Sequence, residues 1–211
     1  MEENKITRLT VQKKNPDRVN VYLDGTFAFG LYMDTAAWLE VGQILSDEKI
    51  HELQSTDRKR EIIVKALEFI SYKPRTVGET KKKLREAGFE DDIIADAVKE
   101  LKKDGLLNDA RYARQWVEER QMLRPRSRRV LEMELRRKGI SDTLIQRTVE
   151  DVDDYASAYE IASNRLYKYN GLSEFDFRRK LRAYLSGKGY TYDVISEVGE
   201  KLWKQVNTSD E

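Results

Sequence analysis

Cysteine is absent from the 211-residue sequence, and histidine occurs only once. The lack of cysteine excludes disulfide bonds, thiolate nucleophiles and cysteine-ligated zinc. His51 lies in a polar stretch that is typical of a solvated helix, so we do not expect histidine-based catalysis. No run of about 18 apolar residues is present, and the opening residues lack the apolar stretch of a signal peptide. We therefore expect a cytoplasmic protein with no membrane span.

Motifs for nucleotide or metal chemistry are missing as well. Gly187-Lys188-Gly189 lacks the upstream glycine and the following Ser or Thr of a phosphate-binding loop. The acidic clusters at 90–92 and 151–154 lie at expected helix ends, and we interpret them as caps or solvated faces rather than metal ligands. The sequence therefore predicts a protein that is not an enzyme, with no catalytic residues, no metal and no cofactor.

The composition favours a helical protein with a large charged surface. Lys and Arg number 39, Asp and Glu number 38, and charged residues make up 36% of the chain, against about 25% in a typical globular domain. Hydrophobic residues make up 39%, which is enough for modest cores. We expect a mostly α fold rather than a thick buried sheet.

The N-terminal part of the chain has a different pattern. Residues 6–12 and 19–23 alternate apolar and polar side chains, and Asp24-Gly25 follows as a typical hairpin turn. We therefore predict a three-stranded antiparallel β meander, followed by short helices near 31–39 and 46–54. Residues 1–57 are also acidic, with six Lys and Arg against ten Asp and Glu.

The rest of the chain contains an internal repeat with a period near 50 residues. In each copy a Leu is followed four residues later by a Gly and then by an apolar residue, ahead of a second apolar helix. This spacing predicts a helix that ends at a left-handed glycine cap, with the next side chain packing back on the helix. The shared positions are Leu84, Leu135 and Leu185, then Gly88, Gly139 and Gly189, then Phe89, Ile140 and Tyr190.

A further amphipathic helix precedes each pair, at 60–71, 109–121 and 154–168. Because units of this size bury little surface alone, we expect them to stack. The predicted fold is mostly α, with three tandem three-helix repeats in an elongated curved array and a small N-terminal antiparallel β meander. The predicted parts are residues 1–57 for the meander and short helices, 58–104, 105–153 and 154–207 for the repeats, and 208–211 for a disordered tail.

One stretch, 120–138, is strongly basic, with eight basic residues against two acidic ones. Arginine presents a planar fork that suits phosphate or carboxylate, so the stretch predicts a surface for an anionic partner, although most charge runs are only solvated faces. We expect Arg124, Arg126, Arg129 and Arg136 to share one exposed patch there. The candidate partner- or DNA-binding residues are Arg120, Arg124, Arg126, Arg128, Arg129, Arg136, Arg137 and Lys138, with secondary clusters at Lys81, Lys82 and Lys83 and at Arg178, Arg179, Lys180 and Arg182.

Three motifs lie within the stretch 105–140. They are Gly105-Leu106-Leu107, Asp109-Ala110-Arg111-Tyr112-Ala113 and Glu134-Leu135-Arg136-Arg137-Lys138-Gly139-Ile140. With these motifs the stretch resembles the RecX family of RecA modulators, and the resemblance extends over the three repeats and the β extension of longer members. One departure is Arg124 before Pro125, where many members have glycine, which makes this loop stiffer and more basic.

The resemblance implies a regulator of DNA repair, recombination and the SOS response. Such a protein binds the RecA filament on single-stranded DNA in its helical groove and suppresses ATP hydrolysis, strand exchange and co-protease activity. We expect a monomer that makes at most weak direct contact with DNA. Two other interpretations of the residues stay open: a helical-repeat nucleic-acid-binding module that contacts phosphates through arginine, and a helical-repeat adaptor with an acidic protein partner.

Overall fold

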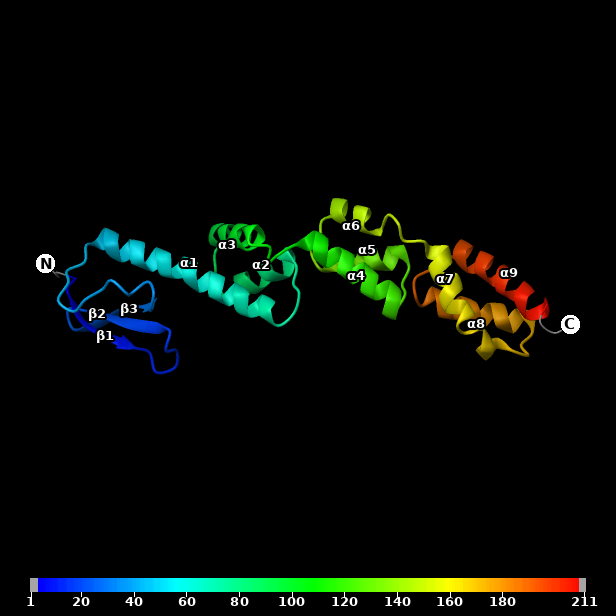
Figure 1. Cartoon of the computed structure of the whole chain (residues 1–211), viewed down its shortest axis with the longest axis horizontal. Helices are drawn as coiled ribbons and strands as arrows, with labels where there is room; N and C mark the ends of the chain where they lie inside the picture. Colours follow the sequence, from blue (N-terminus) through cyan, green and yellow to red (C-terminus); the bar gives the residue numbers. More distant parts are fainter. Residues whose placement is uncertain (1–3, 209–211) are drawn as a thin grey trace. The chain divides into compact units, whose positions relative to one another are not determined.

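The computed structural model describes residues 4–208 (Figure 1). It confirms the predicted fold class, a mostly helical chain with three-helix repeats and an N-terminal antiparallel sheet. The chain divides into two compact units, one formed by residues 1–74 and 80–106 and the other by 75–79 and 107–211. Within residues 4–208, no helix has the length and apolar character needed to cross a membrane. Apart from residue 208, the predicted tail at 208–211 lies outside the described residues.

The predicted meander forms the start of the first unit. Its strands are β1 (Ile6–Val11), β2 (Arg18–Leu23) and β3 (Thr26–Tyr32), paired antiparallel in the order β1-β2-β3. Asp24 and Gly25 both have positive φ, 48° and 86°, as the two central residues of a type I′ hairpin turn require.

The short helix predicted near 31–39 is wrong, and the one predicted near 46–54 is present but does not end there. Residues 33–38 form successive turns, and residues 47–71 form one long helix, α1 (Asp47–Ser71). Neither proline nor glycine occurs within this helix, so nothing interrupts it at residue 57, where the composition changes. Asp57 is buried on α1 and accepts hydrogen bonds from the Arg18 side chain, at 2.8 Å, and from the Tyr32 N–H. The sheet therefore packs on α1, as the marginal stability of an isolated small sheet requires.

The first unit is completed by α2 (Val77–Glu86), apart from its first three residues, and α3 (Asp91–Lys103). The predicted cap is present between them. Gly88 has a φ of +83°, and the Phe89 N–H donates to the Leu84 carbonyl at 3.2 Å. Because Leu84 and Phe89 are both buried, the cap also fixes the turn against the core.

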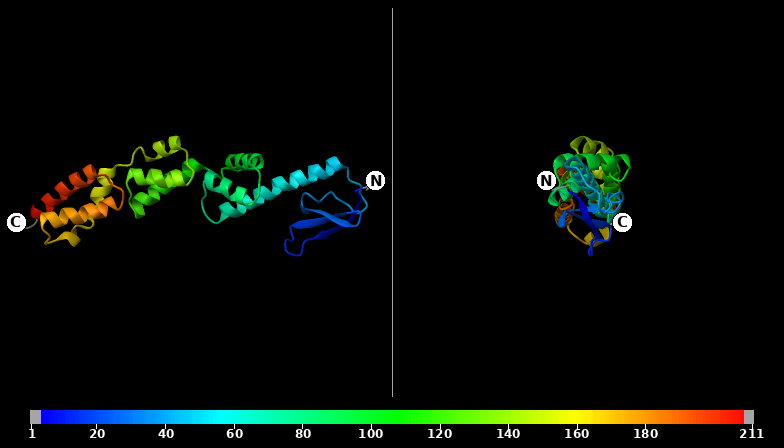
Figure 2. Two further views of the ribbon diagram at one scale, coloured as in Figure 1. Left: turned by 180° about the vertical axis from the view of Figure 1, so that it is seen from behind. Right: turned by 90° about the vertical axis from the view of Figure 1, so that its left-hand side faces the viewer.

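The second unit holds the other two repeats (Figures 1 and 2). The predicted caps recur at Gly139 and Gly189, with φ of +77° and +94°. The helix predicted over 154–168 ends at residue 163, and a 3₁₀ turn follows it. The elements are α4 (Asp109–Leu123), α5 (Arg128–Arg137), α6 (Asp142–Val149), α7 (Asp154–Ser163), η1 (Leu166–Tyr169), α8 (Glu174–Ser186) and α9 (Tyr192–Thr208).

Each repeat of the second unit has its own core. Leu131, Leu135 and Ile145 are fully buried in the core formed by α4, α5 and α6, and Phe177 and Leu185 are fully buried in that of α7, α8 and α9. Two pairs of aromatic side chains line these cores. The rings of Tyr112 and Trp116 stack at a centroid distance of 6.0 Å, and those of Tyr155 and Tyr159 at 6.2 Å. Both pairs therefore contribute to the packing of their repeat.

Candidate partner-binding surface

The cap of helix α5 and its buried apolar face determine which of its basic side chains lie in solvent. The hydroxyl of Ser127 accepts a hydrogen bond from the Val130 N–H and caps the helix. Leu131 and Leu135 are fully buried. With about 100° of rotation per residue, Arg129 lies on the opposite side of the helix from these leucines, in solvent.

Two of the eight basic residues hold α4 and α5 together around Trp116. The carboxylate of Glu134 accepts hydrogen bonds from the Trp116 ring N–H and from Arg120 Nε, both at 2.8 Å. The Arg120 guanidinium lies over the Trp116 ring at 4.3 Å, and Lys138 Nζ lies 5.4 Å from the same ring. Arg120 and Lys138 are only partly exposed, so their contribution is mainly to packing.

Lys138 also forms a half-buried ion pair with Glu79, at 2.7 Å between Nζ and Oε1. The hydrogen bond that Lys138 donates to Glu79 raises the pKa of Lys138, an effect that burial only partly offsets. Burial acts to raise the pKa of Glu79, but the hydrogen bonds from Lys138 and from the Thr76 N–H outweigh it and lower this pKa. Both groups are therefore charged at neutral pH and serve the fold.

Two further arginines bond to backbone carbonyls. Arg126 Nη1 donates to the Gly187 carbonyl at 3.1 Å. Arg128 Nη2 donates to the carbonyls of Glu150 and Val152, at 2.7 and 2.8 Å. The carbonyls of Glu150 and Val152 follow the last turn of α6, where acceptors lack helical partners. Arg126 and Arg128 thus fix chain turns, which the basic pattern of the sequence did not reveal.

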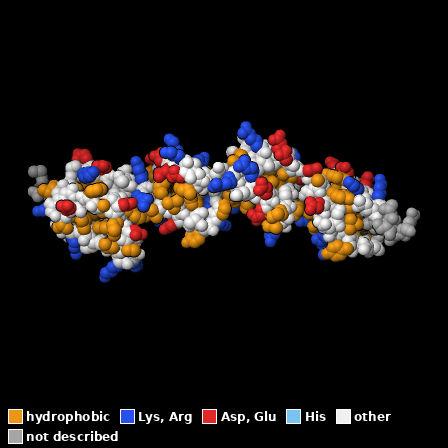
Figure 3. Space-filling model, in the orientation of Figure 1, with side chains coloured by type: hydrophobic (Ala, Val, Ile, Leu, Met, Phe, Trp, Pro, Cys, Tyr) orange, Lys and Arg blue, Asp and Glu red, His pale blue; other side chains and the backbone are white. Residues whose placement is uncertain are grey.

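Three arginines remain available to bind a partner molecule. They are Arg124, Arg129 and Arg137, and we call them the free arginines. All three are exposed, and among the described residues their side chains make no hydrogen bond or ion pair. Arg136 shares the face of Arg129 but pairs with Asp142 at 2.8 Å. Because that pair is exposed, it contributes little stability and can exchange partners. On the face drawn in Figure 3, basic and acidic side chains are interspersed.

The secondary basic clusters lie on α2 and α8, as expected. Lys82 and Lys83 are exposed and Lys81 is half-buried. On α8, Arg178 pairs with Glu174 at 2.7 Å and Arg179 pairs with Asp176 at 2.8 Å. Within the described chain Lys180 makes no ion pair, and Arg182 lies over the Tyr192 ring at 5.3 Å.

The side chains that hold the ends of α2 and α5 escaped the sequence analysis. The Asp109 carboxylate accepts from the Val77 N–H at 2.8 Å, and the Thr76 hydroxyl donates to the Lys138 carbonyl. At α5, the Ser127 hydroxyl donates to the Gly189 carbonyl at 2.8 Å. Only the capping-box spacing of Thr76 and Glu79 gave a signal in the sequence, and the reciprocal bonds of that box are present.

Among residues 4–208, no three His, Asp or Glu side chains gather as a cation site. The fold and its basic helices define a helical-repeat protein with an N-terminal sheet and an arginine-rich central repeat.

Comparison with models of protein families shows which family has this architecture. The chain matches the regulatory protein RecX N-terminal domain over residues 4–46 and the first, second and third three-helix domains of RecX over residues 64–101, 108–149 and 151–198. The chain belongs to the RecX family.

Curated relatives match along nearly the whole chain. Regulatory protein RecX of Clostridium perfringens (strain SM101 / Type A) is 31% identical over 205 residues, covering 94% of this chain and 96% of the relative. The protein of the same name from Bacillus subtilis (strain 168) is 30% identical, covering 93% and 76%. A crystal structure of regulatory protein RecX superposes with a TM-score of 0.68 at 24% identity over 93% of this chain, a likeness of fold. The crystal structure of RecX from Lactobacillus salivarius gives 0.63 at 25% identity over 70%.

Proposed function

We propose that this protein is a non-enzymatic inhibitor of the RecA recombinase. In this proposal it binds the RecA filament on single-stranded DNA in its helical groove and suppresses ATP hydrolysis, strand exchange and co-protease activity. The observation that carries the proposal is the match of RecX models to the sheet and to all three repeats. The protein would act as a monomer in the cytoplasm, in DNA repair and the SOS response.

The free arginines, two on α5 and one just after α4, are the contact that we propose for the second repeat. Arg124, Arg129 and Arg137 are exposed and carry no intramolecular partner among the described residues, so binding breaks no existing bond. An arginine fork meets either a RecA carboxylate or a DNA phosphate in two parallel hydrogen bonds. The exposed basic side chains of α2 and α8 extend the proposed surface within each unit.

Binding to labelled single-stranded DNA, bare and coated with RecA, tests this function. We expect strong binding to the coated strand and weak binding to the bare strand under the same salt. Equal binding to both strands, or binding to neither, would contradict the proposal.

A direct nucleic-acid-binding module is the second candidate, and the arginine-rich makeup of the free surface is the observation that favours it. If phosphates are the main partners, the logarithm of the affinity for bare DNA falls steeply and linearly with the logarithm of the salt concentration. A shallow salt dependence that requires RecA favours protein carboxylates instead.

A further inference from the structure

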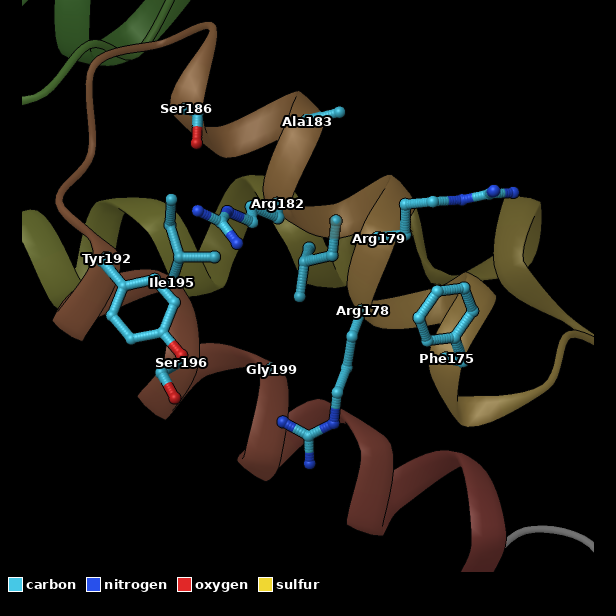
Figure 4. A pocket seen from close by; sticks show the side chains of 11 residues that line it. Phe175, Arg178, Arg179, Arg182, Ala183, Ser186, Tyr192, Ile195, Ser196 and Gly199 are labelled. Atoms are coloured by element: carbon cyan, nitrogen blue, oxygen red, sulfur yellow. The ribbon is translucent and has the colours of Figure 1, made fainter.

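Helices α8 and α9 line a pocket whose apolar part has no role in the functions proposed above (Figure 4). Its volume is about 610 Å³, within the range of about 300–1,000 Å³ that is common for ligand sites. Buried Leu181 and Ile195 line its inner side. Gly199 of α9 also lines it and contributes no side chain to fill it.

Two exposed aromatic rings stand at opposite ends of the pocket. Phe175 is 74% exposed and Tyr192 is 64% exposed. Figure 4 shows the two rings apart, with Arg182 and Arg178 between them. A concave apolar surface that is rimmed by polar groups is typical of a binding site.

The charged side chains that line the pocket are all arginines. Arg178, Arg179 and Arg182 line it, and no Asp or Glu is among the lining residues. In Figure 4 Arg178 reaches from α8 toward α9. Arg182 lies over the Tyr192 ring, and Arg179 over the Phe175 ring at 5.9 Å. A guanidinium thus lies over each aromatic ring, so positive charge and apolar surface are side by side in the pocket. We therefore expect an occupant that is both anionic and partly apolar.

We propose that this pocket binds an acidic segment of a partner protein through an aromatic or branched aliphatic side chain flanked by carboxylates. The apolar side chain would contact Leu181 and Ile195, and the carboxylates would bind Arg178 and Arg182. This site does not depend on RecA being the partner.

The intramolecular partners of the arginines favour a peptide over a nucleic acid. The exposed carboxylates of Glu174 and Asp176 already bind Arg178 and Arg179 at 2.7 and 2.8 Å, so these forks are arranged for carboxylate groups. Exposed pairs of this kind contribute little stability, so a partner carboxylate can replace either acid.

The test uses the full-length protein and a short fluorescent peptide of Asp residues with a central Trp. We expect binding by fluorescence anisotropy, and a loss of about tenfold or more in affinity when Arg178→Gln and Arg182→Gln are combined, because charged central contacts dominate such sites. Lys180→Gln is the matched control, since Lys180 is exposed on α8 and does not line the pocket. It should stay within about twofold of the parent.

A second variant keeps every arginine. Ser196 of α9 lines the pocket, so Ser196→Glu places a carboxylate inside it and should weaken the peptide by a similar factor. Three outcomes would overturn the proposal. These are no binding of the peptide, equal binding of an analogue with Asn in place of Asp, and binding of oligo(dT) that competes with the peptide and shows the same dependence on Arg178 and Arg182.

Discussion

The carboxylate of Asp154 accepts a hydrogen bond of 2.7 Å from the backbone N–H of Arg128. Asp154 is in the first turn of α7, and Arg128 is the first residue of α5, so an acid from one repeat caps the middle helix of the repeat before it. Asp109 caps Val77 in the same way at 2.8 Å. The two bonds satisfy N–H groups that have no helical partner and place negative charge at a positive helix end.

Removing this cap should destabilise the second unit. Burial raises the pKa of Asp154, and the hydrogen bond from the Arg128 N–H only partly offsets this. Asp154→Ala is expected to lower the free energy of unfolding by about 1–2 kcal/mol, measured by urea denaturation. Asp154→Asn keeps an acceptor and should lose less than half as much. An unchanged denaturation midpoint in Asp154→Ala would refute the role of the cap.

Two of the left-handed glycines should respond differently to the same substitution. A Cβ at Gly88 meets no atom within 4 Å, whereas a Cβ at Gly189 would lie 2.2 Å from Val130 Cγ2 and 2.7 Å from Ser127 Oγ. Gly88→Ala should cost about 1–2 kcal/mol, from backbone strain alone. Gly189→Ala should cost clearly more, because the strain adds to the clash. Equal losses in parallel denaturation curves would show that the contact at Gly189 is unimportant.

Acid should weaken the fold partly through Glu79. Its pKa is lowered from an ordinary value of 4.5. A carboxyl whose folded pKa is lowered contributes stability above its unfolded pKa, and this stability is lost as the pH falls through the folded pKa. Glu79→Gln should therefore lose stability at neutral pH and show a smaller further loss below about pH 4.5 than the parent does. Melting temperatures across this range measure the effect, and parallel pH profiles would contradict it.

The features that the sequence predicted are those set by local chemistry. The glycine caps depend on a leucine, a glycine and an apolar residue within six positions, and all three form with the expected bond from the residue after glycine. The turn at Asp24 and Gly25 depends on two adjacent residues. The single helix α1 was missed because a change in composition was taken as a break, whereas a helix ends only where its backbone or caps require it.

The sequence could not show which basic residues are available for a partner. Arg128 and Arg129 are adjacent and identical, yet Arg128 binds two carbonyls more than 20 residues away while Arg129 is free among the described residues. Lys138 meets Glu79 across 59 positions. Such pairings arise from tertiary packing, so no local pattern encodes them.

The free arginines should be needed for inhibition of RecA but not for folding. Exposed substitutions usually change stability by less than about 0.5 kcal/mol each, so Arg124→Glu, Arg129→Glu and Arg137→Glu combined should stay folded by circular dichroism. The matched control reverses the exposed lysines Lys13, Lys14 and Lys99 of the first unit to Glu, which makes the same change in net charge. A folded triple arginine variant that inhibits as well as the control would exclude these arginines as the contact.

The rate of RecA ATP hydrolysis on single-stranded DNA, measured while the parent protein is titrated in at fixed salt, is the most direct test of the central claim. The proposed function predicts that the rate falls as the protein is added, that the lysine control inhibits equally, and that the triple arginine variant inhibits far less. A rate that stays constant at every concentration of the folded parent would contradict the claim that this protein inhibits RecA.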